Sequence, residues 1–404
     1  MLQKQIEFYI QQRCTLLGVG PVSKNCVDAT IELANEYEIP IFLIASRRQI
    51  EAREFGGGYV NNWCTEDFAE YVRDKDKKGK VILARDHGGP WQNEFEVSQK
   101  FSLHKAMTSA KKSFQVDIES GFQVLHIDPS IDIWGLSNVD EVLLRTYELY
   151  EFCLETAHKN NRKIAIEIGM EEQSGNIGTL DDILYSLTKV KEFCRNRNLP
   201  PPTFMVVQTG TKVAETKNIG TMSSPFRIAY ELPAEIQIPK MIEICNRHQV
   251  YLKQHNTDYL PDEAISLYPK LGIHAVNVAP EFGVTETRAF LSLLSEHKLN
   301  KYKEQFIKIA YNSKKWEKWM LPETKADEIQ KAVIAGHYVF SHPECIEMKK
   351  EIQRQLTAKN IDLEEYLKTA VKESILRYLR CFRLLRFYER SRVNHYQPQP
   401  ARSH

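Results

Sequence analysis

The chain has 404 residues, of which 42% are hydrophobic, so it can bury a large core. Its formal net charge of +1 argues against electrostatic attraction to nucleic acid or to a membrane surface. The N-terminal residues carry charges throughout and lack the apolar core of a secretion signal, and no apolar run is long enough to span a membrane.

Eight short apolar runs rich in branched side chains predict buried β-strands. They cover residues 15–20, 39–46, 80–87, 124–130, 163–169, 203–210, 250–255 and 272–280. Helical segments alternate with these runs, and the first begins after Ser23, which can cap it. The other predicted helices cover residues 101–121, 138–159, 181–198, 235–248, 261–271 and 285–297, together with one that opens at Thr65.

Regular alternation of strands and helices predicts the fold class. Such alternation implies parallel strands joined by right-handed crossovers, and eight units predict a closed (β/α)₈ TIM barrel, an α/β fold. The alternative is an open doubly wound sheet, which usually has a glycine-rich phosphate turn after its first strand. The segment Val19-Gly20-Pro21-Val22 is not such a turn. We therefore expect a barrel with its functional site at the carboxyl ends of the strands.

The sequence pattern changes at about residue 299, after which helical patterns replace strands. We predict a catalytic barrel domain over residues 1–298, a C-terminal helical appendage over residues 299–390 and a flexible tail over residues 391–404. The run from Arg377 to Arg390 is basic with aromatic residues between, as in a nucleic-acid patch. However, Ile375, Leu379 and Phe382 recur at helical spacing, which favours an amphipathic helix packed on the barrel.

Eight scattered cysteines lack the C-x-x-C spacing of a zinc ribbon. They predict a reduced, cytoplasmic protein rather than one held together by disulfides. The cysteines are Cys14, Cys26, Cys64, Cys153, Cys194, Cys245, Cys345 and Cys381.

The third predicted strand ends in groups that can do chemistry, within the segment KVILARDHGGP over residues 80–90. Asp86 can transfer a proton and His87 can hold a metal ion. The alternative is a strand end without a chemical role, whose polar side chains form hydrogen bonds with neighbouring residues. In a regular strand Asp86 would point away from His87, but Gly88, Gly89 and Pro90 predict an irregular end that turns both side chains toward the site.

Other predicted strands also end in polar residues, which a barrel would bring into one pocket. We expect His87 and His255 to place their ring nitrogens roughly 3–4 Å apart and to form an open metal site with a carboxylate or an amide. His126 is predicted to be structural, because side chains alternate along a strand. The candidate residues after strands four to eight are His126, Asp128, Glu167, Gln208, Lys253, Gln254, His255, Asn256, Asp258, Asn277 and Glu281.

Five sequence blocks at these strand ends carry a resemblance to a known family. They are D-H-x-G-P after strand three, H-x-D on strand four, E-x-G after strand five, V-V-Q-x-G on strand six and H-[NS]-T-D-Y on strand seven. Together they resemble the tagatose-bisphosphate aldolase Z-type subunit family of the class II aldolase superfamily. The resemblance covers most of the chain, and the region around residues 338–343 is also similar.

The resemblance implies a site in which a divalent metal, usually zinc, polarises the carbonyl of a ketose during aldol cleavage. It implies His87 and His255 as metal ligands, Asp86 as the proton shuttle and Glu167 as a second carboxylate on the metal side. Gln208 stands where the superfamily has a third histidine ligand. Since an amide is a weaker zinc ligand than imidazole, this departure puts the metal's affinity and identity in question.

A second departure concerns phosphate binding, for which the superfamily has a glycine-rich run after the strand-seven histidine. Here His255 is followed by Asn256-Thr257-Asp258, and Asp258 would repel a phosphate. A bisphosphate substrate is therefore less favoured than the resemblance implies, and the alternatives are a less charged sugar, a sugar monophosphate bound elsewhere or a nucleotide-linked sugar. We predict substrate contacts from Asn256, Asp258, Asn277, Glu281 and Lys253, and anion contacts from Lys253, Arg47, Arg48 and Lys212.

The leading hypothesis is a metal-dependent, class II aldolase-like lyase that acts on a ketose or ketose phosphate. One alternative is a sugar epimerase with the same metal site. Another is a non-catalytic subunit that supports a separate tagatose-bisphosphate aldolase chain. Retention of Asp86, His87, Glu167 and His255 favours an enzyme, since a scaffold needs none of them. A homo-oligomer or a partner aldolase subunit is possible, and no nucleic-acid or membrane partner is expected.

Overall fold

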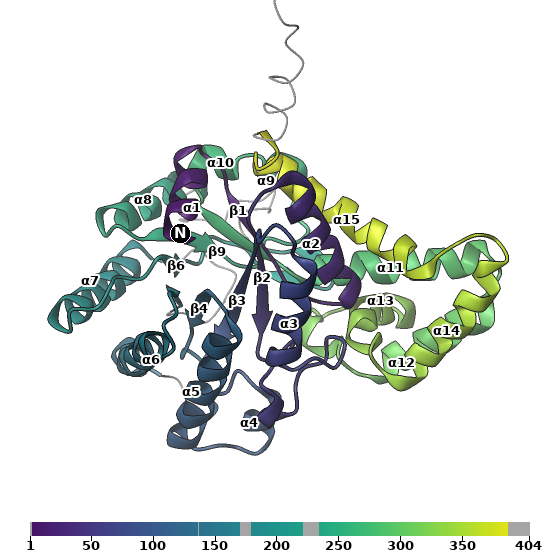
Figure 1. The fold of residues 1–404 in the computed structure, drawn as a ribbon, viewed down its shortest axis with the longest axis horizontal. Coiled ribbons are helices and arrows are strands. Elements are labelled where there is room, and N and C mark those ends of the chain that lie inside the picture. The colour runs from purple at the N-terminus through teal and green to yellow at the C-terminus, as the bar shows by residue number, and fades with distance from the viewer. Residues whose placement is uncertain (1, 136, 170–178, 221–233, 387–404) are drawn as a thin grey trace, which may run out of the picture.

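The computed structural model describes residues 2–135, 137–169, 179–220 and 234–386. Its centre is a closed barrel of strands in the order β1-β10-β9-β6-β5-β4-β3-β2 (Figure 1). All neighbouring barrel strands are parallel. This confirms the predicted TIM barrel. The strands are β1 (Leu16–Val19), β2 (Ile41–Ser46), β3 (Val81–Gly88), β4 (Val124–Ile127), β5 (Ala165–Ile168), β6 (Phe204–Val206), β9 (Tyr251–Gln254) and β10 (Ala275–Val278).

The barrel strands are buried along nearly their whole length. In β1, β4, β5 and β10 every residue is buried. Helices cover the outside of a parallel barrel and side chains fill its inside, which is why each strand is a continuous apolar run in the sequence. The antiparallel hairpin of β7 (Val213–Ala214) and β8 (Lys217–Asn218), which follows β6, is a feature that the sequence pattern does not predict.

Helices connect the strands and surround the barrel (Figure 1). The long ones are α2 (Lys24–Tyr37), α3 (Thr65–Lys75), α5 (Leu103–Ser120), α6 (Val139–Lys159), α7 (Leu180–Asn196), α8 (Ala234–Arg247) and α11 (Pro280–Glu296). As predicted, Ser23 caps α2, since its side chain accepts a hydrogen bond from the Cys26 amide at 3.0 Å. Shorter elements are α1 (Leu2–Gln11), η1 (Arg53–Phe55), α4 (Glu94–Ser98), α9 (Asp262–Ile265) and α10 (Tyr268–Leu271).

Two helices near the site differ from the sequence prediction. The single helix predicted over residues 261–271 is two short ones, α9 and α10, because the ring of Pro269 clashes with the carbonyl four residues earlier and cannot continue α9. α11 begins at Pro280 rather than at residue 285. Proline suits the first turn of a helix, and the Asp258 carboxylate accepts hydrogen bonds from two backbone amides at this N-terminus.

The C-terminal residues form helices, as predicted, and α12, α13 and α14 lie on one side of the barrel (Figure 1). The elements are α12 (Asn300–Asn312), η2 (Glu317–Trp319), α13 (Glu328–Val339), α14 (Pro343–Thr357) and α15 (Leu363–Cys381). Leu363 and Leu367 of α15 pack in a hydrophobic cluster with α11 to α14, whereas Val371, Ile375 and Leu379 pack in the barrel cluster. The domain boundary after residue 298 stays a prediction, and the predicted tail over residues 391–404 lies outside the described residues.

Two expectations from composition can be compared with the structure. All eight cysteines are free thiols, and all but Cys381 are buried. Within the described part of the chain, every helix is too short or too polar to cross a bilayer.

Candidate active site

The carboxyl end of β3 is irregular, which is what the glycines after His87 predict. The register with β4 shifts between Arg85 and Gly88, and His87 has a positive φ of 46°. Gly88 is required here, because a Cβ at this position would lie 2.4 Å from the Phe114 ring. This bulge re-aims the side chains at the end of the strand, so that Asp86 and His87 both line the same cavity.

Four side chains from three strand ends converge at this end of the barrel. Asp86, His87, His126 and His255 each offer a possible ligand atom, and these atoms all lie within 4.8 Å of one another. The His87 Nε2 and His255 Nδ1 atoms are 3.3 Å apart, within the predicted range. Two ligands at about 2.0–2.1 Å from one tetrahedral zinc ion would be separated by a similar distance. The residues present therefore fit a divalent metal such as zinc.

His87 is oriented by the carboxylate of Asp128, a candidate residue to which the sequence assigns no specific role. Its Nδ1 atom lies 2.6 Å from Asp128 Oδ2, so that Nε2 points at the cluster. Burial lowers the pKa of His87, but Asp86 and Asp128 raise it to about 9. Burial lowers the pKa of His255 to about 4, which keeps this imidazole neutral at pH 7. A carboxylate hydrogen-bonded to a ligating histidine is the usual arrangement around a protein-bound metal.

The prediction of a structural role for His126 needs correction, because the side chain belongs to the cluster. β4 pairs with β5 so that His126 lies opposite Glu167, and both face the barrel interior. Its Nδ1 accepts a hydrogen bond from the His87 amide at 3.2 Å, which helps to hold the irregular end of β3. Among the described residues its buried Nε2 has no hydrogen-bond partner.

Glu167 and Lys253 form a buried ion pair behind the cluster. Lys253 Nζ is 2.6 Å from Glu167 Oε2, and Glu167 Oε1 is 3.2 Å from His255 Nε2. Burial alone would raise the pKa of Glu167, but the ammonium of Lys253 and the imidazoles lower it to about 2. Neither side chain lines the cavity. The pair is therefore placed to orient His255 rather than to meet a substrate.

Asp86 and Asn277 lie at the cavity surface of the cluster. Asn277 Nδ2 is 3.0 Å from Asp86 Oδ1 and 3.0 Å from His255 Nε2. Burial alone would raise the pKa of Asp86, but the charge of His87 and the interactions with the His255 and His126 rings hold it well below the ordinary value. Asp86 is therefore ionised at neutral pH.

The remaining predicted residues divide between the cavity wall and its surroundings. Asn256 and Asp258 line the cavity. Glu281 does not, because its carboxylate binds Arg377 at 3.0 Å and the Tyr378 hydroxyl at 2.5 Å, both on α15. Gln208, predicted as a metal ligand, is buried at the end of β6 and is likewise not part of the cavity wall.

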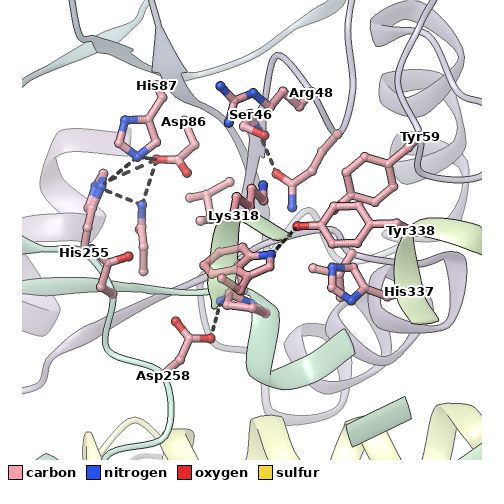
Figure 2. Close-up of a pocket in the computed structure, with 18 of the residues that line it drawn as sticks. Ser46, Arg48, Tyr59, Asp86, His87, His255, Asp258, Lys318, His337 and Tyr338 are labelled. Carbon is pink, nitrogen blue, oxygen red and sulfur yellow. Dashed lines mark hydrogen bonds and ion pairs between the residues drawn. The ribbon is translucent and has the colours of Figure 1, made fainter. Parts of the chain in front are cut away.

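The cavity has a volume of about 180 Å³ and three walls of different origin (Figure 2). Figure 2 shows Asp86 and His87 with His255 on one side and Tyr59 and Tyr338 on the other. The barrel supplies the first wall, and the end of β2 and the segment after it supply Ser46, Arg48, Gln49 and Tyr59. The C-terminal helices supply Lys318, Trp319, His337 and Tyr338, which the sequence analysis did not place at the site.

Solved structures of several other proteins share this fold. It is similar to a probable tagatose 6 phosphate kinase from Sinorhizobium meliloti 1021, with a TM-score of 0.68, 16% identity and coverage of 91% of this chain and 100% of that one. It is similar to the fructose-bisphosphate aldolase of Campylobacter jejuni, with a TM-score of 0.54, 10% identity and coverage of 95% and 94%. The YdjI aldolase of Escherichia coli K12 matches with a TM-score of 0.50, 14% identity and coverage of 95% and 96%.

At these identities the likeness defines the fold and not the reaction. No known family profile matches the chain. No curated protein matches its sequence.

Proposed function

We propose that the chain is a metal-dependent, class II aldolase-like lyase that cleaves or forms a carbon–carbon bond in a ketose or ketose phosphate. The observation that carries this proposal is the convergence of His87, His255 and Asp86 on one cavity at the carboxyl end of the barrel. The five sequence blocks support membership of the class II aldolase superfamily and, more finely, similarity to the Z-type subunits. The shared fold is consistent with both.

In this proposal His87 and His255 hold a divalent metal, and the imidazole-rich ligand set favours zinc. Asp128 fixes the ring of His87, and the Glu167–Lys253 pair fixes that of His255. When bound, the metal supplies a Lewis acid that polarises a carbonyl oxygen. Gln208, which does not line the cavity, is not part of this proposed ligand set.

Asp86 is the proposed proton carrier. It lines the cavity and is ionised at neutral pH, so it can accept the proton of the hydroxyl that becomes the aldehyde. Glu167 is the alternative proton carrier, because a carboxylate at the end of the fifth predicted strand could reach the same carbon. Its burial and its ion pair with Lys253 favour a positioning role instead. Asn277 holds the Asp86 carboxylate in place through a hydrogen bond of 3.0 Å.

Metal analysis tests the site directly. Purified protein should carry about one equivalent of a divalent metal per chain, and His87→Ala should abolish binding while the circular dichroism spectrum stays the same. His104→Ala is the matched control, because His104 is an exposed histidine outside the cavity. Absence of metal from protein that was purified and then supplied with zinc would contradict the proposal.

Activity measurements separate the alternatives. The metal-loaded protein should release an aldehyde from a ketose or a ketose phosphate in a coupled assay. Conversion of one ketose into its epimer without aldehyde release would favour the epimerase alternative. Metal binding without either reaction, together with activation of a separately supplied aldolase chain, would favour the non-catalytic subunit.

A further inference from the structure

Two cationic side chains line the cavity together with the metal-ligand cluster. Arg48 follows β2, and Lys318 belongs to η2 in the C-terminal region. Figure 2 shows Lys318 in the middle of the cavity, between the group of Asp86, His87 and His255 and the aromatic rings of the far wall. Packing of the C-terminal helices on the barrel therefore brings two positive charges to one pocket from distant parts of the sequence.

Neither cation is neutralised by the protein within the described residues. The Nε atom of Arg48 is buried without a hydrogen-bond partner, and no carboxylate forms an ion pair with Arg48 or Lys318. Glu94, which interacts electrostatically with both, is instead ion-paired with Lys315 at 2.8 Å. Burial and the charge of Arg48 lower the pKa of Lys318 to about 8. A buried, unpaired donor such as the Arg48 Nε atom is costly unless a ligand satisfies it, whereas Lys318 is an exposed residue that a ligand can reach.

Aromatic rings hold Lys318 in position. Its ammonium lies 4.8 Å from the centre of the Trp319 ring and 5.3 Å from that of Tyr338. The indole N–H of Trp319 donates to the Tyr338 hydroxyl at 3.2 Å, and Tyr59 packs against Tyr338 with ring centres 4.7 Å apart. These contacts restrict the lysine side chain before any ligand arrives, which lowers the entropic cost of binding.

We infer that Arg48 and Lys318 form a subsite for the anionic group of the substrate, a phosphate or a carboxylate carried by the sugar. The inference rests on the proposed function for the other end of the substrate, whose carbonyl would face the cluster of His87 and His255. Arginine and lysine are the side chains that bind such oxyanions, through charge-assisted hydrogen bonds. The subsite would replace the phosphate loop that the sequence after His255 lacks, where Asp258 is unfavourable to an anion.

Anion binding can be measured by isothermal titration of the metal-loaded protein at low ionic strength with inorganic phosphate and, separately, with acetate. Arg48→Met and Lys318→Met should each weaken binding about tenfold or more, because each removes a charge-assisted hydrogen bond. Lys314→Met is the matched control. It removes the same charge from the same segment, but Lys314 is exposed and does not line the cavity. Its affinity should equal that of the unmodified chain.

The two probes distinguish the chemical sources of the anion. If Arg48→Met and Lys318→Met lose phosphate binding, the substrate is a sugar phosphate. If they lose only acetate binding, the substrate is a sugar acid. If Arg48→Met does not fold, Lys318→Glu decides, since Lys318 is accessible from the cavity and charge reversal should abolish binding. Unchanged affinity for both anions in Lys318→Glu, or an equal loss in Lys314→Met, would overturn the inference.

The anion-binding experiment can fail or succeed independently of the proposed aldolase function. His87→Ala, which is expected to lack the metal, should still bind the anion, because Arg48 and Lys318 remain in place. If the unmodified protein binds the anion but does not bind a metal, the aldolase proposal is refuted and the subsite is supported. A metal-loaded, active lyase whose anion affinity does not depend on Arg48 or Lys318 would refute the subsite alone.

Discussion

At the scale of single residues, the candidate site depends on the hydrogen bonds that orient its imidazoles. The Nδ1 atom of His87 lies 2.6 Å from Asp128, and its Nε2 atom faces His255. His255 is oriented by Glu167, which Lys253 in turn neutralises. Asp86 is the one carboxylate of the cluster that also reaches the cavity. Its substitution should therefore affect proton transfer more than metal binding.

Asp86→Ala should keep the metal but lower turnover by about two to four orders of magnitude, the usual contribution of a general acid–base. Glu167→Gln keeps the size of the side chain and should mainly lower metal affinity, since Glu167 contacts His255 and not the cavity. Turnover and metal content should be measured for both variants on the same ketose. Normal turnover in Asp86→Ala with an inactive, metal-loaded Glu167→Gln would reverse the two roles.

Asp258 makes a specific contribution to the pH dependence of stability. Burial and the charge of Glu281 raise its pKa from 3.8 to about 7. Between these values the folded state binds a proton that the unfolded state has released, so the free energy of unfolding falls as the pH rises. Asp258→Asn does not titrate, and its amide oxygen can still accept the hydrogen bonds from Ala279 and Glu281 at the start of α11.

The comparison should be made by urea denaturation at pH 5 and pH 7. The unmodified chain should lose about 2 kcal/mol more than Asp258→Asn over this interval, given about 1.4 kcal/mol for each pH unit between the two pKa values. Equal pH dependence in the two proteins would show that the carboxyl group of Asp258 titrates at its ordinary value.

At the scale of the elements, α15 binds the segments that follow β9 and β10. Arg377 bonds to Asp262 at 2.5 Å and to Glu281 at 3.0 Å. The Tyr378 hydroxyl donates to Glu281, which also accepts from the Tyr259 amide. The same helix thus holds Glu281 away from the cavity and stabilises the segment that carries Asp258.

Tyr378→Phe removes the hydroxyl that donates to the Glu281 carboxylate. The free energy of unfolding should fall by about 1.5–3 kcal/mol, the range for a hydrogen bond to a charged group. Tyr366→Phe is the control, because Tyr366 is an exposed tyrosine on the same helix. A loss no larger than that of the control in urea denaturation would show that α15 holds this loop through packing alone.

At the scale of the whole molecule, the barrel and the C-terminal helices share both structure and site. α15 belongs to the second hydrophobic cluster at its start and to the barrel cluster over the rest of its length. The C-terminal region also provides one wall of the cavity, including Lys318 and Tyr338. The barrel alone would therefore lack both buried apolar surface and part of the site.

A fragment of residues 1–298 should fail to fold cooperatively. It lacks Val371, Ile375, Leu379 and Phe382, which are buried against the barrel, and their removal would expose apolar surface to water. Circular dichroism, size-exclusion chromatography and thermal denaturation should show an aggregated or partly unfolded species beside the intact chain. A monodisperse fragment with a sharp unfolding transition would instead support the predicted domain boundary at residue 298.

The barrel could be predicted from the amino-acid sequence, because parallel strands buried on both faces are continuous apolar runs that can be recognised locally. The sequence also indicated Asp86, His87 and His255, since the carboxyl ends of such strands meet at one end of a barrel. The glycines after His87 predicted the irregular strand end for the same local reason, their lack of a side chain.

Which other side chains reach the cavity could not be predicted from the sequence, because it depends on tertiary contacts. Alternation along a strand suggested a structural His126, but in a barrel one face of every strand points into the shared interior, where His126 meets Asp86 and Glu167. Glu281 turned away because α15 offers it Arg377 and Tyr378. Lys318 and Tyr338 line the site because the C-terminal helices pack over the barrel end. Such contacts join residues far apart in the chain, and no local pattern specifies them.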